Sequence, residues 1–227
     1  MLGSGEIAVV ETTVALCRVL KLGEAALGQS VPTLKVDYND DIRTPEVIGP
    51  DVKKGRAFLT GPSRLTRSDV LRDFLYRNSV LVGLSIPQIE ELKLAADYTN
   101  PDGDLSFVEF DQNINGIPVF RGEVKAGFTK QGELIRVINN LAAGLDTATL
   151  SAGFGDPITA VQLAAKFIYV DATKFSLNVN ESASTANKVV LGSGESATTA
   201  EKMYFPTEPG VAIPAWRVLI WRPEAVG

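Results

Sequence analysis

Histidine is absent from this 227-residue sequence, and cysteine occurs once, as Cys17. The lack of histidine excludes Ser–His–Asp and Cys–His catalysis and the His-Glu-x-x-His zinc site, because each of these needs an imidazole. A single cysteine excludes a disulfide within the chain and a cysteine-built zinc or iron–sulfur cage. The carboxylates that remain show no spacing that distinguishes a catalytic pair, so an enzyme that uses them is only a remote alternative.

Positive charge and long apolar runs are also scarce. Lys plus Arg number 22 against 27 Asp plus Glu, which gives a formal net charge of −5. This excludes a general basic nucleic-acid binder, because duplex binding depends on neutralising phosphates. No apolar run reaches the roughly 18 residues of a spanning helix, so no membrane partner is expected. The apolar stretch 7–20 contains Glu11 and Arg18, which is unlike the core of a signal peptide.

Apolar residues spaced three and four apart predict helices at four places. These cover residues 6–27, 65–84, 85–92 and 157–168. The first also suits a strand, because it is rich in β-branched residues. The clearest is the second, where Thr66 is an N-cap with Asp69 three residues later, and where Gly83 can end the helix in the left-handed conformation. The helix after Pro157 is predicted to be capped by Asp156.

Alternating polarity predicts antiparallel strands with one face on a core and one in water. They cover residues 34–38, 105–111, 117–128, 133–138, 188–191, 202–205 and 213–221. Asn115-Gly116 is a strong hairpin signal, because both residues tolerate positive φ. The core side of the strand that follows is expected to consist of Phe120, Val124, Ala126 and Phe128. Residues 40–64 are rich in proline and charge and are predicted to be an irregular linker.

A helical segment followed by an antiparallel meander occurs twice in this order, which predicts the α+β class. We expect two similar modules in tandem, joined near residues 145–156. The predicted domains are therefore 65–150 and 151–227, after an N-terminal lead-in segment of 1–64.

The segment 107–124 reads FVEFDQNINGIPVFRGEV and resembles the fungalysin/thermolysin propeptide motif. That motif has a Gln, a turn of Gly-hydrophobic-Pro-Val-Phe and a Gly-Glu pair before a strand that ends in a Gly turn. The positions of this sequence that match it are Gln112, Asn115, Gly116, Pro118, Val119, Phe120, Gly122, Glu123 and Gly132. The region after residue 157 is similar to a PepSY module, with the strand 203–206 and the closing segment 215–218.

The resemblance implies the prosegment of a secreted zinc metallopeptidase of the fungalysin type, built of two cystatin-like modules. Residues 65–150 would be the propeptide-motif module and 151–227 the PepSY-like module. It implies a non-catalytic chain that inhibits its cognate catalytic domain and assists its folding. That domain is expected after residue 227, and it would hold the zinc, whereas this chain is expected to hold no cofactor. The residues expected to contact the peptidase are Trp216, Arg217, Trp221, Arg222 and Glu224.

Three alternatives remain open. The chain could be a stand-alone secreted cystatin-like binding or inhibitor module with no attached peptidase, which the reading frame beyond residue 227 would distinguish. The segment 112–116 also has the spacing of the cystatin loop Gln-x-Val-x-Gly, with Ile in place of Val, although a turn that sets strand register explains it more simply. Residues 98–109 have some spacing of a calcium loop, but Tyr98 stands where a carboxylate is needed, which favours a solvated turn.

Overall fold

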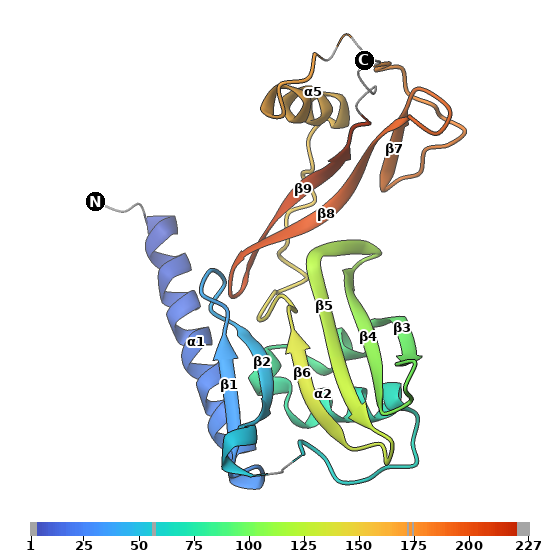
Figure 1. Ribbon diagram of the computed structural model, residues 1–227. Helices are drawn as coiled ribbons and strands as arrows, with labels where there is room; N and C mark the ends of the chain where they lie inside the picture. The colour runs from blue at the N-terminus through green and yellow to red at the C-terminus, as the bar shows by residue number, and fades with distance from the viewer. Residues whose placement is uncertain (1–3, 56–57, 172, 174, 222–227) are drawn as a thin grey trace. The chain divides into compact units, whose positions relative to one another are not determined.

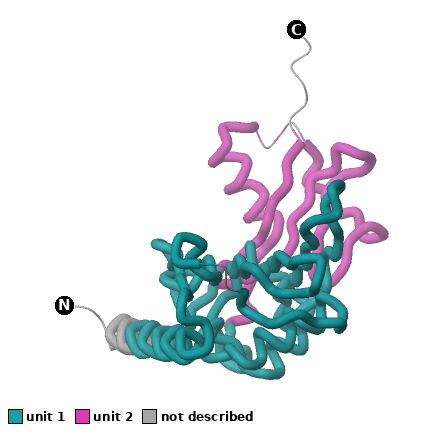
Figure 2. Tube along the Cα trace, turned by 60° about the horizontal axis from the view of Figure 1, so that its bottom comes forward, with its two compact units in different colours: residues 1–150, 206–212 teal, residues 151–205, 213–227 magenta. Residues whose placement is uncertain are grey.

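The computed structural model describes residues 4–55, 58–171, 173 and 175–221 (Figure 1). The protein is α+β and contains a large antiparallel sheet. The chain divides into two compact units (Figure 2). Unit 1 consists of residues 1–150 and 206–212, and unit 2 consists of residues 151–205 and 213–227. None of the described helices is long and apolar enough to cross a membrane.

Unit 1 combines helices with an antiparallel sheet. Its helices are α1 (Ser4–Ser30), α2 (Arg67–Arg77), α3 (Ser79–Val82) and α4 (Ile86–Glu90), with a short 3₁₀ helix, η1 (Val52–Lys54), before α2. Its strands are β1 (Leu34–Tyr38), β2 (Pro45–Pro50), β3 (Lys93–Thr99), β4 (Leu105–Ile114), β5 (Ile117–Thr129) and β6 (Leu134–Asn139). The strands lie in the order β1-β2-β6-β5-β4-β3, and each neighbouring pair is antiparallel.

The helix caps of unit 1 follow the predicted residues. Thr66 Oγ1 accepts a hydrogen bond from Asp69 N at 3.2 Å, and Gly83 ends α3 in the left-handed conformation with φ 68°. The single helix predicted for 65–84 is wrong, because the chain breaks at Asn78 into α2 and α3. The side-chain amide of Asn78 donates to Phe74 O at 2.8 Å. Asparagine commonly makes such local bonds to the backbone, and they compete with regular helix.

The core of unit 1 lies between the helices and one face of the sheet. Figure 1 shows α2 behind strands β4 to β6. The largest fully buried side chains of this core include Leu71, Leu75, Leu81, Ile89, Phe110, Phe128 and Leu134. Each contributes about 1.5–3 kcal/mol by leaving water, so this core is the main source of stability for the unit.

Two strands of unit 1 depart from the predictions. The linker expected over 40–64 contains β2, which pairs with β1 and with β6. Its prolines, Pro45 and Pro50, are the first and last residues of the strand, where proline disturbs the ladder least. Strand β3 was not expected, because it is the edge strand and nearly all of its side chains are exposed, so it shows no alternation.

The predicted core side of β5 is correct for Val124, Ala126 and Phe128, all of which are buried. It is wrong for Phe120, because Val119 is buried in its place and Phe120 is only half-buried. Arg121 has a φ of 52°, and this left-handed residue interrupts the alternation between Val119 and Val124. A strict period of two therefore fails across that position.

In the described part of the chain, unit 2 contains α5 (Pro157–Phe167), β7 (Lys188–Leu191) and most of β8 (Thr198–Glu208) and β9 (Val211–Leu219). Residues 206–212, which connect β8 and β9, belong to unit 1. Asp156 caps α5 as predicted, since its carboxylate accepts from Thr159 N at 2.7 Å. Strand β7 pairs with β8 in antiparallel register, and β8 also pairs with β9. The strands predicted over 188–191, 202–205 and 213–221 are confirmed, with β8 longer than expected.

Candidate functional site

The β4–β5 hairpin contains most of the residues that resemble the propeptide motif. Asn115 has φ 53° and Gly116 has φ 78°, as a two-residue turn with both central residues left-handed requires. Ile114 then pairs with Ile117 at the end of the ladder. The predicted hairpin is confirmed, and its turn sets the register of the two pairs next to it, before the register shifts between Asp111 and Asn113.

Gln112 is buried beneath this hairpin, with 3% of its surface exposed. Its Nε2 donates to Ala142 O at 3.3 Å, and its Oε1 accepts from Ala142 N at 2.8 Å. The side chain thereby holds the segment after β6 against β4. A residue placed in this way fixes structure, and it does not offer its amide to a partner's cleft.

Two of the three motif glycines, Gly122 and Gly132, stand where neighbouring atoms leave no room for a side chain. A Cβ added at Gly122 would lie 2.7 Å from Val119 Cβ and 3.2 Å from Gln112 Cβ. Gly132 has a φ of 78°, and a Cβ there would overlap the carbonyl oxygen of Ser63. Both positions therefore need glycine for packing reasons.

The remaining motif residues lie on β5 itself. Pro118 and Phe120 are half-buried, and the guanidinium of Arg121 lies 5.4 Å from the centre of the Phe120 ring. The side chain of Glu123 is directed to the opposite face of the sheet from Val124, which is buried. The side chain of Glu123 therefore lies on the solvent side of the sheet.

The outward face of the β3–β6 sheet carries a shallow apolar depression of about 280 Å³. We define the outward face by the side chains on the solvent side of these four strands, which are Tyr98, Phe107, Glu109, Glu123, Lys125, Gly127, Arg136 and Ile138. The rings of Tyr98 and Phe107 stack with their centroids 5.3 Å apart. Phe107 pairs across the sheet with Gly127, which supplies no side chain, and the floor of the depression is open there.

Charged groups surround the depression. Lys125 Nζ lies 3.2 Å from Glu123 Oε1 and 3.4 Å from Glu109 Oε2. The hydrogen bond to Glu123, together with the charges of both glutamates, raises the pKa of Lys125 above its ordinary value against a smaller opposing effect of desolvation. Arg136, by contrast, forms no ion pair within the described part of the chain.

Three carboxylates of this region come close together. Glu109, Asp111 and Glu123 each have an oxygen within 4.8 Å of the others. Lys125 is already bound to two of them, so an ammonium group offsets part of the negative charge that a metal ion would otherwise offset. The arrangement is an ion-pair ladder on a sheet surface, which is a common cross-strand arrangement.

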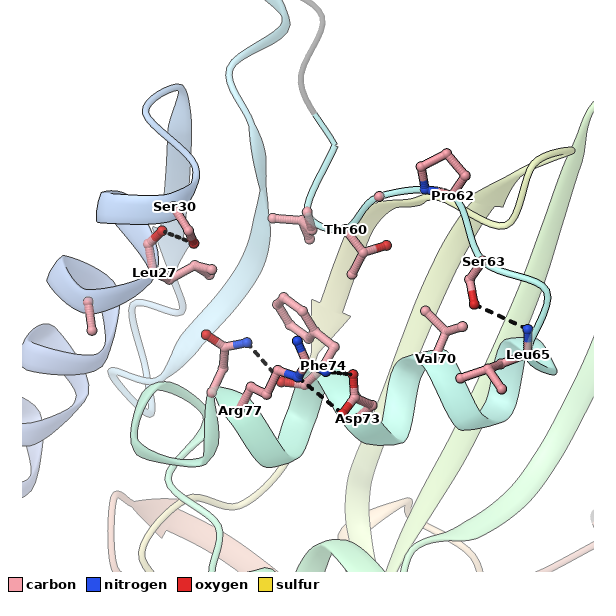
Figure 3. Close-up of a pocket in the computed structure, with 14 residues that line it drawn as sticks. Leu27, Ser30, Thr60, Pro62, Ser63, Leu65, Val70, Asp73, Phe74 and Arg77 are labelled. Carbon is pink, nitrogen blue, oxygen red and sulfur yellow. Dashed lines mark hydrogen bonds and ion pairs between the residues drawn. The ribbon is translucent and has the colours of Figure 1, made fainter.

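A larger cavity of about 610 Å³ lies between the end of α1, the segment 59–65 and α2 (Figure 3). Figure 3 shows Val70 and Phe74 of α2 beneath Thr60 and Pro62. Its polar groups are already engaged, because Arg77 pairs with Asp73 at 3.0 Å and Ser63 Oγ accepts from Leu65 N at 3.1 Å. These engaged groups do not form a set of free polar side chains that could bind or transform a ligand in the cavity.

Five side chains in and after the C-terminal strand are expected to contact a peptidase, and those that the structure describes differ in burial and in bonding. The indole N–H of Trp216 donates to Phe154 O at 2.7 Å, and its ring packs against the core of unit 2. Arg217 is paired with Glu201. Trp221 is 54% exposed. Arg222 and Glu224 lie outside the described residues.

Comparison with known proteins supports the resemblance for one segment. Residues 90–141 match the family model described as the Fungalysin/Thermolysin Propeptide Motif. This range is less than a quarter of the 227 residues. It begins at the last residue of α4 and covers β3 to β6, so it includes the whole hairpin and the outward face. No curated protein matches the chain.

This region of the chain therefore carries a propeptide motif of the fungalysin/thermolysin type. In this structure, Gln112, Asn115, Gly116, Gly122 and Gly132 build the hairpin and its supports. The motif could be found from the sequence because turn glycines and prolines have fixed offsets. The outward depression could not, because its side chains come from four strands.

Proposed function

We propose that this chain is a non-catalytic propeptide of a secreted zinc metallopeptidase, and that it binds the catalytic domain as an inhibitor and folding assistant. The observation that carries the proposal is the propeptide-motif match over residues 90–141. The absence of histidine from the sequence agrees with it, because the histidine ligands of a peptidase zinc site would have to come from another domain. The proposal places the protein outside the cell.

An inhibitor that is covalently linked to its enzyme does not need a high affinity for it. A covalently linked inhibitor meets its target at an effective concentration on the order of millimolar, so modest contact energy is enough to occupy the cleft. Cleavage of the linker followed by dilution then favours release. In this proposal, unit 1 corresponds to the propeptide-motif module and unit 2 to a PepSY-like module, both of the cystatin-like type. Trp221 remains a candidate contact because it is exposed.

The proposal is tested by adding the purified chain to zinc peptidases. Thermolysin and a fungalysin serve as probe enzymes with a fluorogenic peptide substrate, and papain serves as the control. We expect dose-dependent inhibition of at least one zinc peptidase and none of papain. Inhibition of papain would favour the stand-alone cystatin-like module, although the burial of Gln112 argues against that role. Full activity of both zinc enzymes would count against inhibition.

A further inference from the structure

The motif-matched segment offers a partner only one of its two faces. Its inward face is covered by the chain's own helices, which bury Phe110, Val124 and Phe128 of β4 and β5. Those helices lie almost wholly before residue 90, outside the matched range. A binding function that belongs to the matched segment itself would therefore use the outward face.

The depression on this face has the size and lining of an anchor site. Its volume of about 280 Å³ is below the range of about 300–1,000 Å³ that is usual for small-molecule sites. The stacked rings of Tyr98 and Phe107 form one wall, and Ile138 of β6, which is 42% exposed and pairs with Lys125, also lines the depression. Protein interfaces commonly place one large apolar side chain in such a pocket near their centre.

The charged residues beside the depression indicate which charge the partner carries next to that apolar side chain. Lys125 is neutralised by Glu109 and Glu123, so it is not available to an incoming anion. Arg136 lines the depression, is exposed and has no ion pair among the described residues. A guanidinium binds carboxylates in a two-pronged geometry. The complementary segment therefore carries a carboxylate next to its apolar side chain.

We infer that the outward depression receives one large apolar side chain of the peptidase's catalytic domain, next to a carboxylate that pairs with Arg136. This inference rests on the proposed function, since that function supplies the partner. The contact requires no rearrangement of the sheet, because the open floor at Gly127 is built by strand register. It places the contact surface on unit 1.

The site is tested first without any peptidase. The probe is N-acetyl-Phe-Glu-amide, titrated into the ¹⁵N-labelled chain, with N-acetyl-Phe-Lys-amide as the charge control. We expect amide shift changes centred on Phe107, Gly127 and Ile138, and binding of the Lys peptide about tenfold weaker. Shift changes that are absent, or that centre on the larger cavity at Thr60 and Phe74, would overturn the inference.

Gly127→Val is the variant that fills the depression. A Cβ at Gly127 would lie 3.6 Å from Phe107 Cε1, which is ordinary contact. The circular dichroism spectrum and urea midpoint of the variant check that it folds like the wild type. Gly61→Val is the matched control, because a Cβ there meets nothing within 4 Å and it lies at the larger cavity. We expect Gly127→Val to weaken binding of the Glu peptide about tenfold and Gly61→Val to leave it unchanged.

Thermolysin inhibition then separates this inference from the proposed function. Inhibition that Gly127→Val weakens about tenfold and Gly61→Val does not supports both. Equal inhibition by both variants overturns the depression as the contact and leaves the propeptide role intact. Peptide binding without inhibition contradicts the propeptide role and, with it, the catalytic domain as occupant. A dimer of the wild-type chain in sedimentation that Gly127→Val dissociates would assign the depression to a second copy.

Discussion

Both units contain helix and antiparallel strands, but they differ in how many large apolar side chains they bury. Unit 1 encloses a cluster that includes Leu71, Leu75, Phe110 and Phe128. Among the described residues of unit 2, one buried cluster includes Val161, Leu191 and Ala200 with half-buried residues around it, and Met203 and Tyr204 are also buried. Since stability grows with the apolar area buried, unit 1 can hold its shape by packing, whereas unit 2 depends more on caps and single polar contacts.

Unit 2 also contains a cluster of aromatic rings at its β8–β9 hairpin, which adds packing to its buried apolar residues. The Phe154 ring lies 5.4 Å from Tyr204 and 6.2 Å from Trp216, and Lys202 Nζ lies 5.4 Å from the centre of the Phe154 ring. Both tryptophans of the chain, Trp216 and Trp221, belong to this unit. Tryptophan fluorescence consequently reports on unit 2, while far-UV circular dichroism reports on the whole chain.

The largest effect is expected from Phe128→Ala in the core of unit 1. Phe128 is fully buried, and its truncation leaves a cavity that costs about 3–5 kcal/mol. In urea unfolding, the circular dichroism transition should move by this amount and the tryptophan fluorescence transition by much less. Phe167→Ala is the control, since Phe167 is 83% exposed and should change stability by under about 0.5 kcal/mol. Equal shifts in both signals would show that the units unfold together.

The second-largest effect is expected from Gln112→Ala, which should lower the free energy of unfolding of unit 1 by about 2–3 kcal/mol. The substitution leaves the buried N–H and C=O of Ala142 without their hydrogen-bond partners. Faster hydrogen exchange at the Ala142 amide, together with a lower urea midpoint, would check this reason. Gln131→Ala in an exposed turn is the matched control and should be neutral. An unchanged midpoint would mean that the motif glutamine serves a partner instead of the fold.

Val161→Ala tests the core of unit 2 and should lower its free energy of unfolding by about 1.5–2 kcal/mol. Val161 is fully buried in α5, and two methyl groups are lost at about 0.8 kcal/mol each, with a small cavity term. The fluorescence transition should move and most of the circular dichroism amplitude should not. Leu163→Ala on the exposed side of the same helix is the control. A larger loss than that of Phe128→Ala would reverse the ranking of the two cores.

Local signals in the sequence predicted the caps, turns and most strands. Thr66, Asp156 and Asn115-Gly116 act within three or four residues of themselves, so their geometry follows from short-range chemistry. The edge strand β3 and the proline-bounded β2 were missed, since each is defined by its partner strand and not by its own pattern. The left-handed Arg121 was also missed, since arginine carries no local signal for positive φ.

The candidate site divides in the same way. The motif glycines and Gln112 could be found because their spacing along the chain is fixed. The outward depression brings together Tyr98, Phe107, Gly127 and Arg136 through pairings across β3 to β6. A shift of one residue in any of those pairings would send the side chains to the other face. Register, which the sequence determines only through the assembled sheet, is thus the missing information.

The smallest expected effect concerns the cap of unit 2 and its dependence on pH. Hydrogen bonds from the Thr159 side chain and backbone hold the pKa of Asp156 below its ordinary value. A carboxylate with a lowered pKa in the folded state stabilises that state above its unfolded pKa, and this contribution is lost as pH falls through the folded pKa. Fluorescence-monitored stability of unit 2 should therefore decline below about pH 4.

Asp156→Asn separates this cap from other acid effects. Asparagine still caps a helix but does not titrate, so the variant should lose less stability than the wild type between about pH 4 and pH 2. Thr159→Val, which removes the hydroxyl donor, should move the Asp156 pKa back toward its ordinary range in an NMR titration. Identical acid profiles for wild type and Asp156→Asn would show that the cap does not set the acid response of unit 2. The contrast would then rest on core size alone, because the polar contacts of unit 2 would add no measurable pH dependence to its small apolar cluster.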